Sequence, residues 1–267
     1  MGEMTRNVVV SRIDVAAADV EKKRDFVSRE VPLHIFLDSI HFVSILCSPI
    51  LLKELAVGHL LGEGVISSVD EISNINFDEE SRCYVSLREA DVEKRTVVSK
   101  PFTRLIVSAC GDAGYRSLSE LLDSVRLKPL PSWHVKAKTI LKSVRELNVL
   151  GDTFRKTGGV HVAGLFRRDG KLVVLAEDVG RHNAVDKVVG AAALRGEDLG
   201  GCFLGLSGRL TGDIALKAAR AGVPVVGSLA AAVDSGVVVA ERFGVTLIGF
   251  VRGSRMNVYA CPWRVDV

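Results

Sequence analysis

The sequence has only five cysteines, and no two of them form a CxxC pair. An odd number of widely spaced cysteines does not build a disulfide framework, and the missing pairs exclude a cysteine-rich structural zinc site. A nucleophilic-serine elbow and a Walker-type phosphate loop are also missing, which excludes two common classes of catalytic site. The cysteines are Cys47, Cys83, Cys110, Cys202 and Cys261.

Long apolar runs and basic clusters are absent too. Mean hydropathy is high at +0.26, but charged residues interrupt every apolar stretch before the roughly 20 residues that a membrane-spanning helix requires. The only apolar run in residues 1–12 is Val8–Val10, which is too short for a signal peptide. The largest basic cluster, Lys22–Arg24, is too small for a nucleic-acid footprint. We therefore expect a cytoplasmic protein that binds neither membranes nor nucleic acid.

The chain has 267 residues, of which 48% are apolar and 25% charged, a composition that can bury a sizeable core. Its net charge of +3 is unevenly distributed. Residues 1–150 carry 20 Lys and Arg against 21 Asp and Glu, whereas residues 151–267 carry 15 against 11 and hold 19 of the 25 glycines. A mildly positive, glycine-rich half suits an anionic, phosphorylated ligand. A plain α/β domain with many turn glycines would have the same composition.

The apolar pattern predicts two α/β domains, residues 1–130 and 131–267, with the boundary at Pro129 and Pro131. In the first domain we expect a hairpin, a helix and three further strands, at 33–37, 41–46, 49–61, 72–77, 83–87 and 104–108. In the second, a helix at 133–147 precedes strands at 160–166, 171–176, 202–206, 223–228 and 245–251, with helices between most of them. These strands are uninterrupted apolar runs, so helices should cover both faces of the sheet. The predicted fold is a three-layer α/β/α domain with a mixed, largely parallel sheet.

Polar residues follow the ends of these strands. Three turns combine glycine with arginine, and they contain Arg181, Arg209, and the pair Arg252 and Arg255. A fourth turn precedes the first strand of the second domain and ends at His161. Because ligands bind at the carboxyl edge of such a sheet, and helix N-termini there favour phosphate, we expect a pyrophosphate-type ligand. Ordinary turn chemistry is the alternative reading.

Two further residue types bear on the chemistry. His161 and His182 have no cysteine or carboxylate at zinc-ligand spacing, so we expect them to line a polar pocket and to hold no metal. Cys110 lies in a glycine-containing loop, where a thiolate could accept sulfane sulfur from a donor persulfide and pass it on. An ordinary structural cysteine is the alternative at this position, and Cys202, which begins an apolar strand, is expected in the core.

Several segments together form a pattern that is characteristic of one family. They are Thr157–His161, Glu177–Gly190 (EDVGRHNAVDKVVG), Ser207–Arg209, Lys217–Pro224, Gly249–Tyr259, Glu30–Leu33 and Glu54–Val65. This pattern, which runs from Glu30 to Tyr259, resembles the formate dehydrogenase accessory sulfurtransferase (FdhD) family. The 14-residue string at 177–190 is its most specific part.

The resemblance implies a cytidine-deaminase-like fold for residues 131–267, without the zinc ligands. It implies that Cys110, in the loop 109–116, takes sulfur as a persulfide from a cysteine desulfurase. The acceptor would be the molybdenum of a bis-molybdopterin guanine dinucleotide cofactor, before its insertion into the formate dehydrogenase catalytic subunit. We also expect a homodimer, and guanosine diphosphate as a usable surrogate ligand. The expected cofactor-binding residues are Phe250, Val251, Arg252, Gly253, Ser254 and Arg255, together with Arg181, His182, Arg209 and His161.

The sequence departs from the family pattern at two places. The family loop has a second cysteine where this chain has Ala113, and it has Ser-Ala-Pro-Thr where this chain has Ala230–Val233. These losses keep open an alternative function, a molybdenum-cofactor-binding chaperone that transfers no sulfur. A deaminase-type hydrolase is excluded, because the zinc ligands and a His-x-Glu general-base arrangement are missing.

Overall fold

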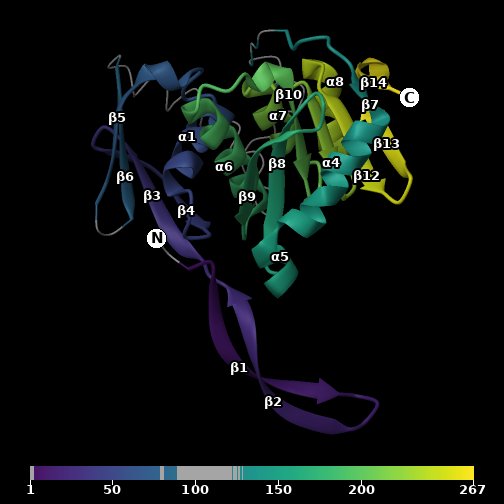
Figure 1. The fold of residues 1–267 in the computed structure, drawn as a ribbon. Coiled ribbons are helices and arrows are strands. Elements are labelled where there is room, and N and C mark those ends of the chain that lie inside the picture. The colour runs from purple at the N-terminus through teal and green to yellow at the C-terminus, as the bar shows by residue number, and fades with distance from the viewer. Residues whose placement is uncertain (1–2, 79–80, 89–121, 123–124, 126, 128) are drawn as a thin grey trace, which may run out of the picture.

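The computed structural model describes residues 3–78, 81–88, 122, 125, 127 and 129–267 (Figure 1). Cys110, its loop at 109–116 and the expected strand at 104–108 lie outside these residues. In the described part of the chain, no helix has both the length and the apolar character needed to cross a membrane.

The largest sheet has six strands in the order β13–β12–β11–β10–β8–β9. Their bounds are β8 His161–Arg167, β9 Leu172–Asp178, β10 Cys202–Leu206, β11 Val225–Ser228, β12 Thr246–Arg252 and β13 Arg255–Ala260. β11 is parallel to both of its neighbours, β10 and β12. The other three pairs, β10–β8, β8–β9 and β12–β13, are antiparallel.

The prediction of a mixed sheet is therefore confirmed, but the prediction that it is largely parallel is wrong. Tight turns at 168–171 and 253–254 join β8 to β9 and β12 to β13, and a connection this short permits only an antiparallel pair. Continuous apolar runs indicated parallel strands, yet an antiparallel strand covered on both faces has the same pattern. The runs therefore report burial and carry no information on strand direction.

Helices cover both faces of this sheet, as predicted. Helix α4 (Ala137–Leu150) packs on one face, where Ile140, Val144 and Leu147 meet Phe166 and Phe203 of the strands. Helix α6 (Arg181–Leu194) covers the other face at β8 and β9, α7 (Gly212–Arg220) lies beside it, and α8 (Asp234–Phe243) packs near β12 and β13. A short helix, α5 (Asp152–Thr157), connects α4 to β8.

The N-terminal part adds a second sheet of four strands in the order β4–β3–β6–β5. The strands are β3 Val31–Leu37, β4 Ile40–Cys47, β5 Ile72–Phe77 and β6 Arg82–Leu87. The antiparallel pairing of β3 with β4 confirms the expected hairpin. Ahead of it, β1 (Thr5–Asp14) and β2 (Asp19–Ser28) form a separate ribbon, which extends away from the body (Figure 1). The remaining short elements are the pair β7 (Val135–Lys136) and β14 (Val265–Asp266), with single turns at 69–71, 199–201 and 262–264.

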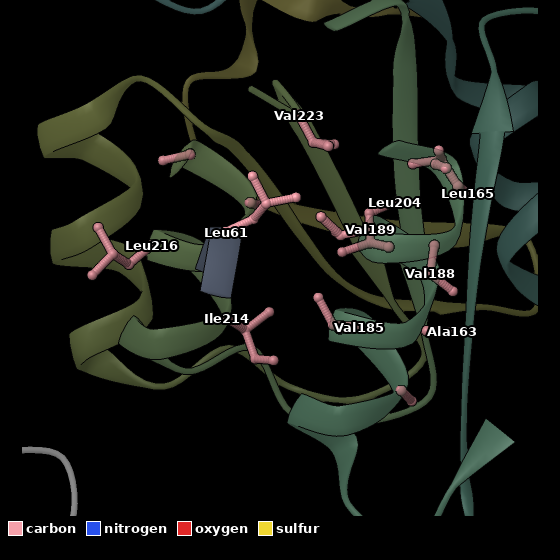
Figure 2. Packing of buried hydrophobic residues seen from close by; sticks show 14 of the residues in the cluster. Leu61, Ala163, Leu165, Val185, Val188, Val189, Leu204, Ile214, Leu216 and Val223 are labelled. Atoms are coloured by element: carbon pink, nitrogen blue, oxygen red, sulfur yellow. The ribbon is translucent and has the colours of Figure 1, made fainter. Parts of the chain in front are cut away.

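Helix α1 (Leu52–Glu63) packs on α6 and joins the two sheets into a continuous core. Figure 2 shows Leu61 of α1 in one cluster with Val185 and Val189 of α6. The two helix backbones touch at glycines. A Cβ atom on Gly58 would overlap the carbonyl oxygen of Asp186, and one on Gly190 would overlap that of Glu54. Two of the segments that carry the family resemblance, Glu54–Val65 and Glu177–Gly190, thus meet at a contact that only glycine permits.

A buried ion pair holds the start of α6 to the end of β4. Lys187 Nζ lies 2.6 Å from Asp178 Oδ2, and both side chains are fully buried. Ser48 contributes its amide to Asp178 Oδ2 at 3.0 Å, accepts from Lys187 Nζ with its carbonyl at 3.0 Å, and receives the Val179 amide on its hydroxyl. Asn183 Nδ2 donates to the other carboxylate oxygen, Asp178 Oδ1, at 2.9 Å. Helix α1 itself begins after Leu51 without a side-chain cap, because the nearby Ser48 hydroxyl is bonded within this network.

A second buried network joins α1, α6 and α7. Lys217 Nζ contacts Asp186 Oδ2 at 2.9 Å and Glu63 Oε1 at 3.1 Å. Burial alone would lower the pKa of Lys217, but these two carboxylates raise it above its ordinary value, so the amine stays charged. His59 Nδ1 lies 3.3 Å from the same Asp186 oxygen.

Replacing Gly58 or Gly190 by alanine is expected to destabilise the protein. Helix propensity favours alanine by about 1 kcal/mol, but the new methyl group would have to displace a backbone carbonyl of the facing helix. Urea unfolding should show a loss of at least about 2 kcal/mol for either variant. Gly200→Ala is the matched control, because its Cβ would meet nothing closer than 3.3 Å. Equal stability of all three variants would contradict this account of the helix contact.

Removing the buried amine of Lys187 is expected to lower the free energy of unfolding more than removing an exposed lysine amine does. Lys187→Met leaves the Asp178 carboxylate without its counter-ion in a fully buried position. We expect a loss of roughly 3–5 kcal/mol in the free energy of unfolding. The exposed control Lys171→Met should change it by less than about 0.5 kcal/mol. A small effect at both positions would show that Asp178 does not depend on the amine.

Candidate functional site

A cavity of about 540 Å³ lies at the carboxyl edge of the six-stranded sheet. This volume is within the range of about 300–1,000 Å³ that is typical of small-molecule sites. It is lined by Asn148, Phe154, Gly158, Gly159, Val160, His161, Val179, Ser207, Leu229, Ala230 and Arg252. The lining therefore combines all four of the predicted turns, which begin at Thr157, Glu177, Ser207 and Arg252.

His161 begins β8 and is held against the turn that follows β10. Its Nδ1 atom lies 3.4 Å from the Ser207 hydroxyl, which also accepts the Val162 amide at 3.0 Å. Burial, followed by the charges of Arg181 and His182, lowers the pKa of His161, and Asp178 opposes them only in part. His161 is thus a neutral ring at neutral pH, available to donate or accept one hydrogen bond toward the cavity.

Arg181 and His182 are the first two residues of α6. The Arg181 side chain lies against Gly208, where a Cβ atom would come within 2.9 Å of it. Its Nε atom is shielded from solvent and has no hydrogen-bond partner among the described residues. A buried guanidinium donor without a partner is costly. An anion bound beside it would remove that cost.

His182 is paired with an acid at the start of α7. Its Nε2 atom lies 2.6 Å from Asp213 Oδ2. Burial alone would raise the pKa of Asp213, but the adjacent His182 ring and Thr211 hydroxyl lower it well below its ordinary value. The Asp213 carboxylate is therefore ionised, and its contact with Nε2 holds the His182 ring against the start of α7.

The segment 250–255 contributes mainly through Arg252. Phe250 adopts a left-handed backbone conformation, with φ of 53°, and its amide donates to Ala230 O at 2.9 Å. This bend accompanies a register shift between β12 and β13. It brings the guanidinium of Arg252 over the Phe250 ring, 4.9 Å from its centroid, where Arg252 also lines the cavity.

Other expected site residues lie further from the cavity. Val251 is fully buried in the core beneath α4, so its side chain faces away from the site. Gly253, Ser254 and Arg255 are exposed in and after the β12–β13 turn and are not among the lining residues. Arg209 is also exposed, next to Gly208.

Three features of the site were not foreseen. Asn148 and Phe154 line the cavity from α4 and α5, and only the packing of those helices brings them to the sheet edge. Glu177 accepts the amides of Thr153 and Phe154 at 3.1 and 2.7 Å and so anchors the start of α5. Gly151 and Gly158, which bracket α5, were the available sequence signal for that short helix.

The substituted segment 230–233 presents an apolar edge to the cavity. Ala230 lines it with a methyl group, and its amide donates to Ser228 Oγ at 3.0 Å. That hydroxyl in turn donates to Gly208 O at 2.6 Å. Both hydrogen bonds of the Ser228 hydroxyl are thus made to the backbone, and segment 230–233 itself contributes no side-chain hydroxyl to the cavity.

The four cysteines that the structure describes, Cys47, Cys83, Cys202 and Cys261, are all buried and free. Burial is the main cause that raises the pKa of each thiol, to about 12 for Cys47 and Cys83. A buried thiol that stays protonated is a poor nucleophile. None of these four cysteines suits a carrier role, and the prediction that Cys202 lies in the core is confirmed.

Comparison with known proteins places this architecture in a family. The model of the FdhD/NarQ family matches residues 28–266. The sulfur carrier protein FdhD of Bacillus pumilus is 36% identical over 245 residues, which cover 91% of each chain. The protein of the same name from Methanothermobacter thermautotrophicus is 33% identical over 255 residues, 95% of this chain and 97% of that protein.

A solved structure extends the likeness to the whole fold. The crystal structure assigned as a formate dehydrogenase accessory protein of Desulfotalea psychrophila is 28% identical, with a TM-score of 0.78. The match covers 99% of this chain and all of that one. The general function predicted from the sequence, sulfur carriage in support of formate dehydrogenase, agrees with the names of these relatives. The chain belongs to the FdhD/NarQ family.

Proposed function

We propose that this protein is a sulfurtransferase that carries sulfur on Cys110 from a cysteine desulfurase to a molybdenum cofactor. The acceptor is a bis-molybdopterin guanine dinucleotide, held at the carboxyl-edge cavity and destined for the formate dehydrogenase catalytic subunit. The observation that carries the assignment to Cys110 is the state of the other cysteines. All four are buried thiols with raised pKa values, which leaves one cysteine of the five for the carrier role.

The loading step is an exchange between a thiolate and a persulfide. The Cys110 thiolate attacks the outer, sulfane sulfur of the desulfurase persulfide, the S–S bond of the donor breaks, and the donor cysteine leaves as a thiolate. The new Cys110 persulfide contains the same number of electrons as the one consumed, so no oxidant or reductant is needed. In the second step the S–S bond of the Cys110 persulfide breaks and Cys110 leaves as a thiolate. The sulfane sulfur reaches the sulfide level by taking two electrons from the reduced molybdenum of the cofactor, which is the substrate here and the reductant of this step.

The cavity suits one dinucleotide arm of that cofactor. Arg252 and the neutral His161 line it. Arg181 and His182 do not line it, but they lie close enough to His161 to lower the pKa of its ring. A pyrophosphate would give the buried Arg181 Nε donor the partner that it lacks among the described residues. The cavity volume of roughly 540 Å³ is enough for a nucleoside diphosphate but not for both arms of a bis-dinucleotide. A homodimer would offer two such cavities, and we include this state in the proposal.

The remaining parts of the proposal concern context. The cytidine-deaminase-like arrangement of residues 131–267 is what the family resemblance implies. Their division from residues 1–130 rests on Pro129 and Pro131, and a cytoplasmic location is part of the same proposal. The cationic rim supports guanosine diphosphate as a surrogate ligand, with Gly253, Ser254, Arg255 and Arg209 outside the cavity lining as secondary contacts.

Cys110→Ala is expected to abolish sulfur loading. Intact mass spectrometry after incubation with a cysteine desulfurase and cysteine should show a gain of about 32 Da, one sulfur atom, in the parent protein. The gain should be absent from Cys110→Ala and present in the control Cys261→Ala, because the Cys261 thiol is buried. An adduct that persists in Cys110→Ala would overturn the assignment. No adduct in the parent would favour the alternative, a chaperone that transfers no sulfur.

Arg252→Ala and Arg181→Ala are expected to weaken guanosine diphosphate binding. Each removes a charged donor at or beside the cavity, and a charge-assisted hydrogen bond contributes about 1.5–3 kcal/mol. Isothermal titration should therefore give a dissociation constant at least about tenfold higher for each variant. Arg195→Ala, at the opposite end of α6, is the control, and Cys110 loading should be unchanged throughout. Unaltered affinity in both cavity variants would place the ligand elsewhere.

A further inference from the structure

The ribbon of β1 and β2 forms a sheet of its own, apart from the two larger sheets. The two strands pair over ten residues with each other and with no other strand in the part of the chain that the structure describes. Figure 1 shows them extending from the body as an arm. A two-stranded ribbon is marginal in water without a surface to cover it. The composition of its two faces indicates what that surface is.

The register separates the side chains of the arm into two unlike faces. Residues directly opposite each other share a face, so Val9, Ile13, Val20 and Phe26 lie on one side together with Lys22 and Arg24. We call these six residues the arm face. The four apolar side chains are 69%, 65%, 61% and 46% exposed.

All the acidic residues of the arm lie on its other side. Asp14, Asp19, Glu21 and Asp25 fall at the alternate positions of the same two strands. The arm face is thus apolar and cationic, and within these two fully described strands it has no carboxylate. Such a face is complementary to an apolar surface bordered by Asp and Glu.

The root of the arm contacts the loop that lines the cavity. Ser28, the last residue of β2, lies on the side of the arm face, and its hydroxyl is 2.7 Å from the Thr157 hydroxyl. Thr157 donates to Thr153 O and accepts the Gly159 amide, so Ser28 is the donor to Thr157. Gly158 and Gly159 of the same loop line the cavity. A protein that covers the arm down to its root would therefore reach the loop that lines the cavity.

We propose that the arm face is the docking surface for the protein that receives the cavity ligand, the cofactor-free formate dehydrogenase catalytic subunit. This inference rests on the proposed function, which identifies the cargo and its acceptor. The acceptor offers an apolar patch bordered by carboxylates. Two arm faces packed against each other would bring Lys22 and Arg24 of one copy close to those of the other, which disfavours that arrangement of a second copy.

The test compares charge reversals on the two faces of the same arm. Lys22→Glu/Arg24→Glu changes the arm face, and Arg6→Glu/Lys23→Glu makes the same change in charge on the opposite face, at residues that are also exposed. Val9→Thr/Val20→Thr removes apolar contact while keeping β-branched side chains, so the ribbon stays formed. Full-length parent and variants are measured by biolayer interferometry against the purified cofactor-free catalytic subunit. Guanosine diphosphate affinity, sulfur loading and sedimentation velocity are recorded for each.

We expect Lys22→Glu/Arg24→Glu to weaken binding of the subunit at least about tenfold and Val9→Thr/Val20→Thr about fivefold, against less than about twofold for the control. Guanosine diphosphate affinity, sulfur loading and oligomeric state should be unchanged. Equal effects on both faces, or none, would overturn the proposal. It is also overturned if the arm-face variants lose sulfur loading, since the desulfurase is then the occupant, or dissociate into monomers, since a second copy is.

The guanosine diphosphate measurement separates this inference from the proposed function. If the parent binds the nucleotide and the arm-face variants bind the subunit as tightly as the parent does, the docking surface alone is refuted. A parent that binds neither nucleotide nor subunit refutes the proposed function as well.

Discussion

The buried ion pair between Asp178 and Lys187 is the interaction on which the site depends. Taking two charges out of water is expensive, and the cost is offset only when geometry and extra hydrogen bonds are good. Here the 2.6 Å contact is completed by Ser48, Asn183 and the Gly180 amide. These bonds fix the end of β9, the start of α6 and the end of β4 to one another. Arg181 and His182 follow Asp178 by three and four residues, so their position is set by this pair.

The segment 177–190 therefore contains both residues that hold α6 in place and residues that lie at the cavity, and its composition does not show which are which. Asp178, Asn183, Asp186 and Lys187 point inward and hold α6 in place, while Arg181 and His182 stand at the cavity end. Glu177 does neither, since its carboxylate anchors the first turn of α5. Buried charges are neutralised by close partners, whereas the rim keeps an excess of positive charge. That contrast directs an anion to the edge of the sheet and not into its core.

Strand pairing and one left-handed residue bring segments that are distant in sequence together at this edge. Antiparallel pairing of β8 with β10 brings His161 beside Ser207, and the left-handed Phe250 turns Arg252 toward the same space. Ser28 connects the N-terminal arm to this group through Thr157. The root of the arm and the cavity therefore share the segment Thr157–Gly159.

The sequence by itself determined the family, the two covered faces of the sheet and the turns that form the cavity. Apolar runs report burial, glycine with arginine reports a turn able to meet an anion, and the string at 177–190 is specific enough to name a family. Those are local properties, legible in consecutive residues. Strand direction, the placement of Asn148 and Phe154, and the use of Ser48 in an ion network were decided only by tertiary structure. Each depends on a partner more than 100 residues away or on how a helix packs. The same holds for Gly58 and Gly190, whose need for glycine arises where two helix backbones touch, a contact that no local pattern records.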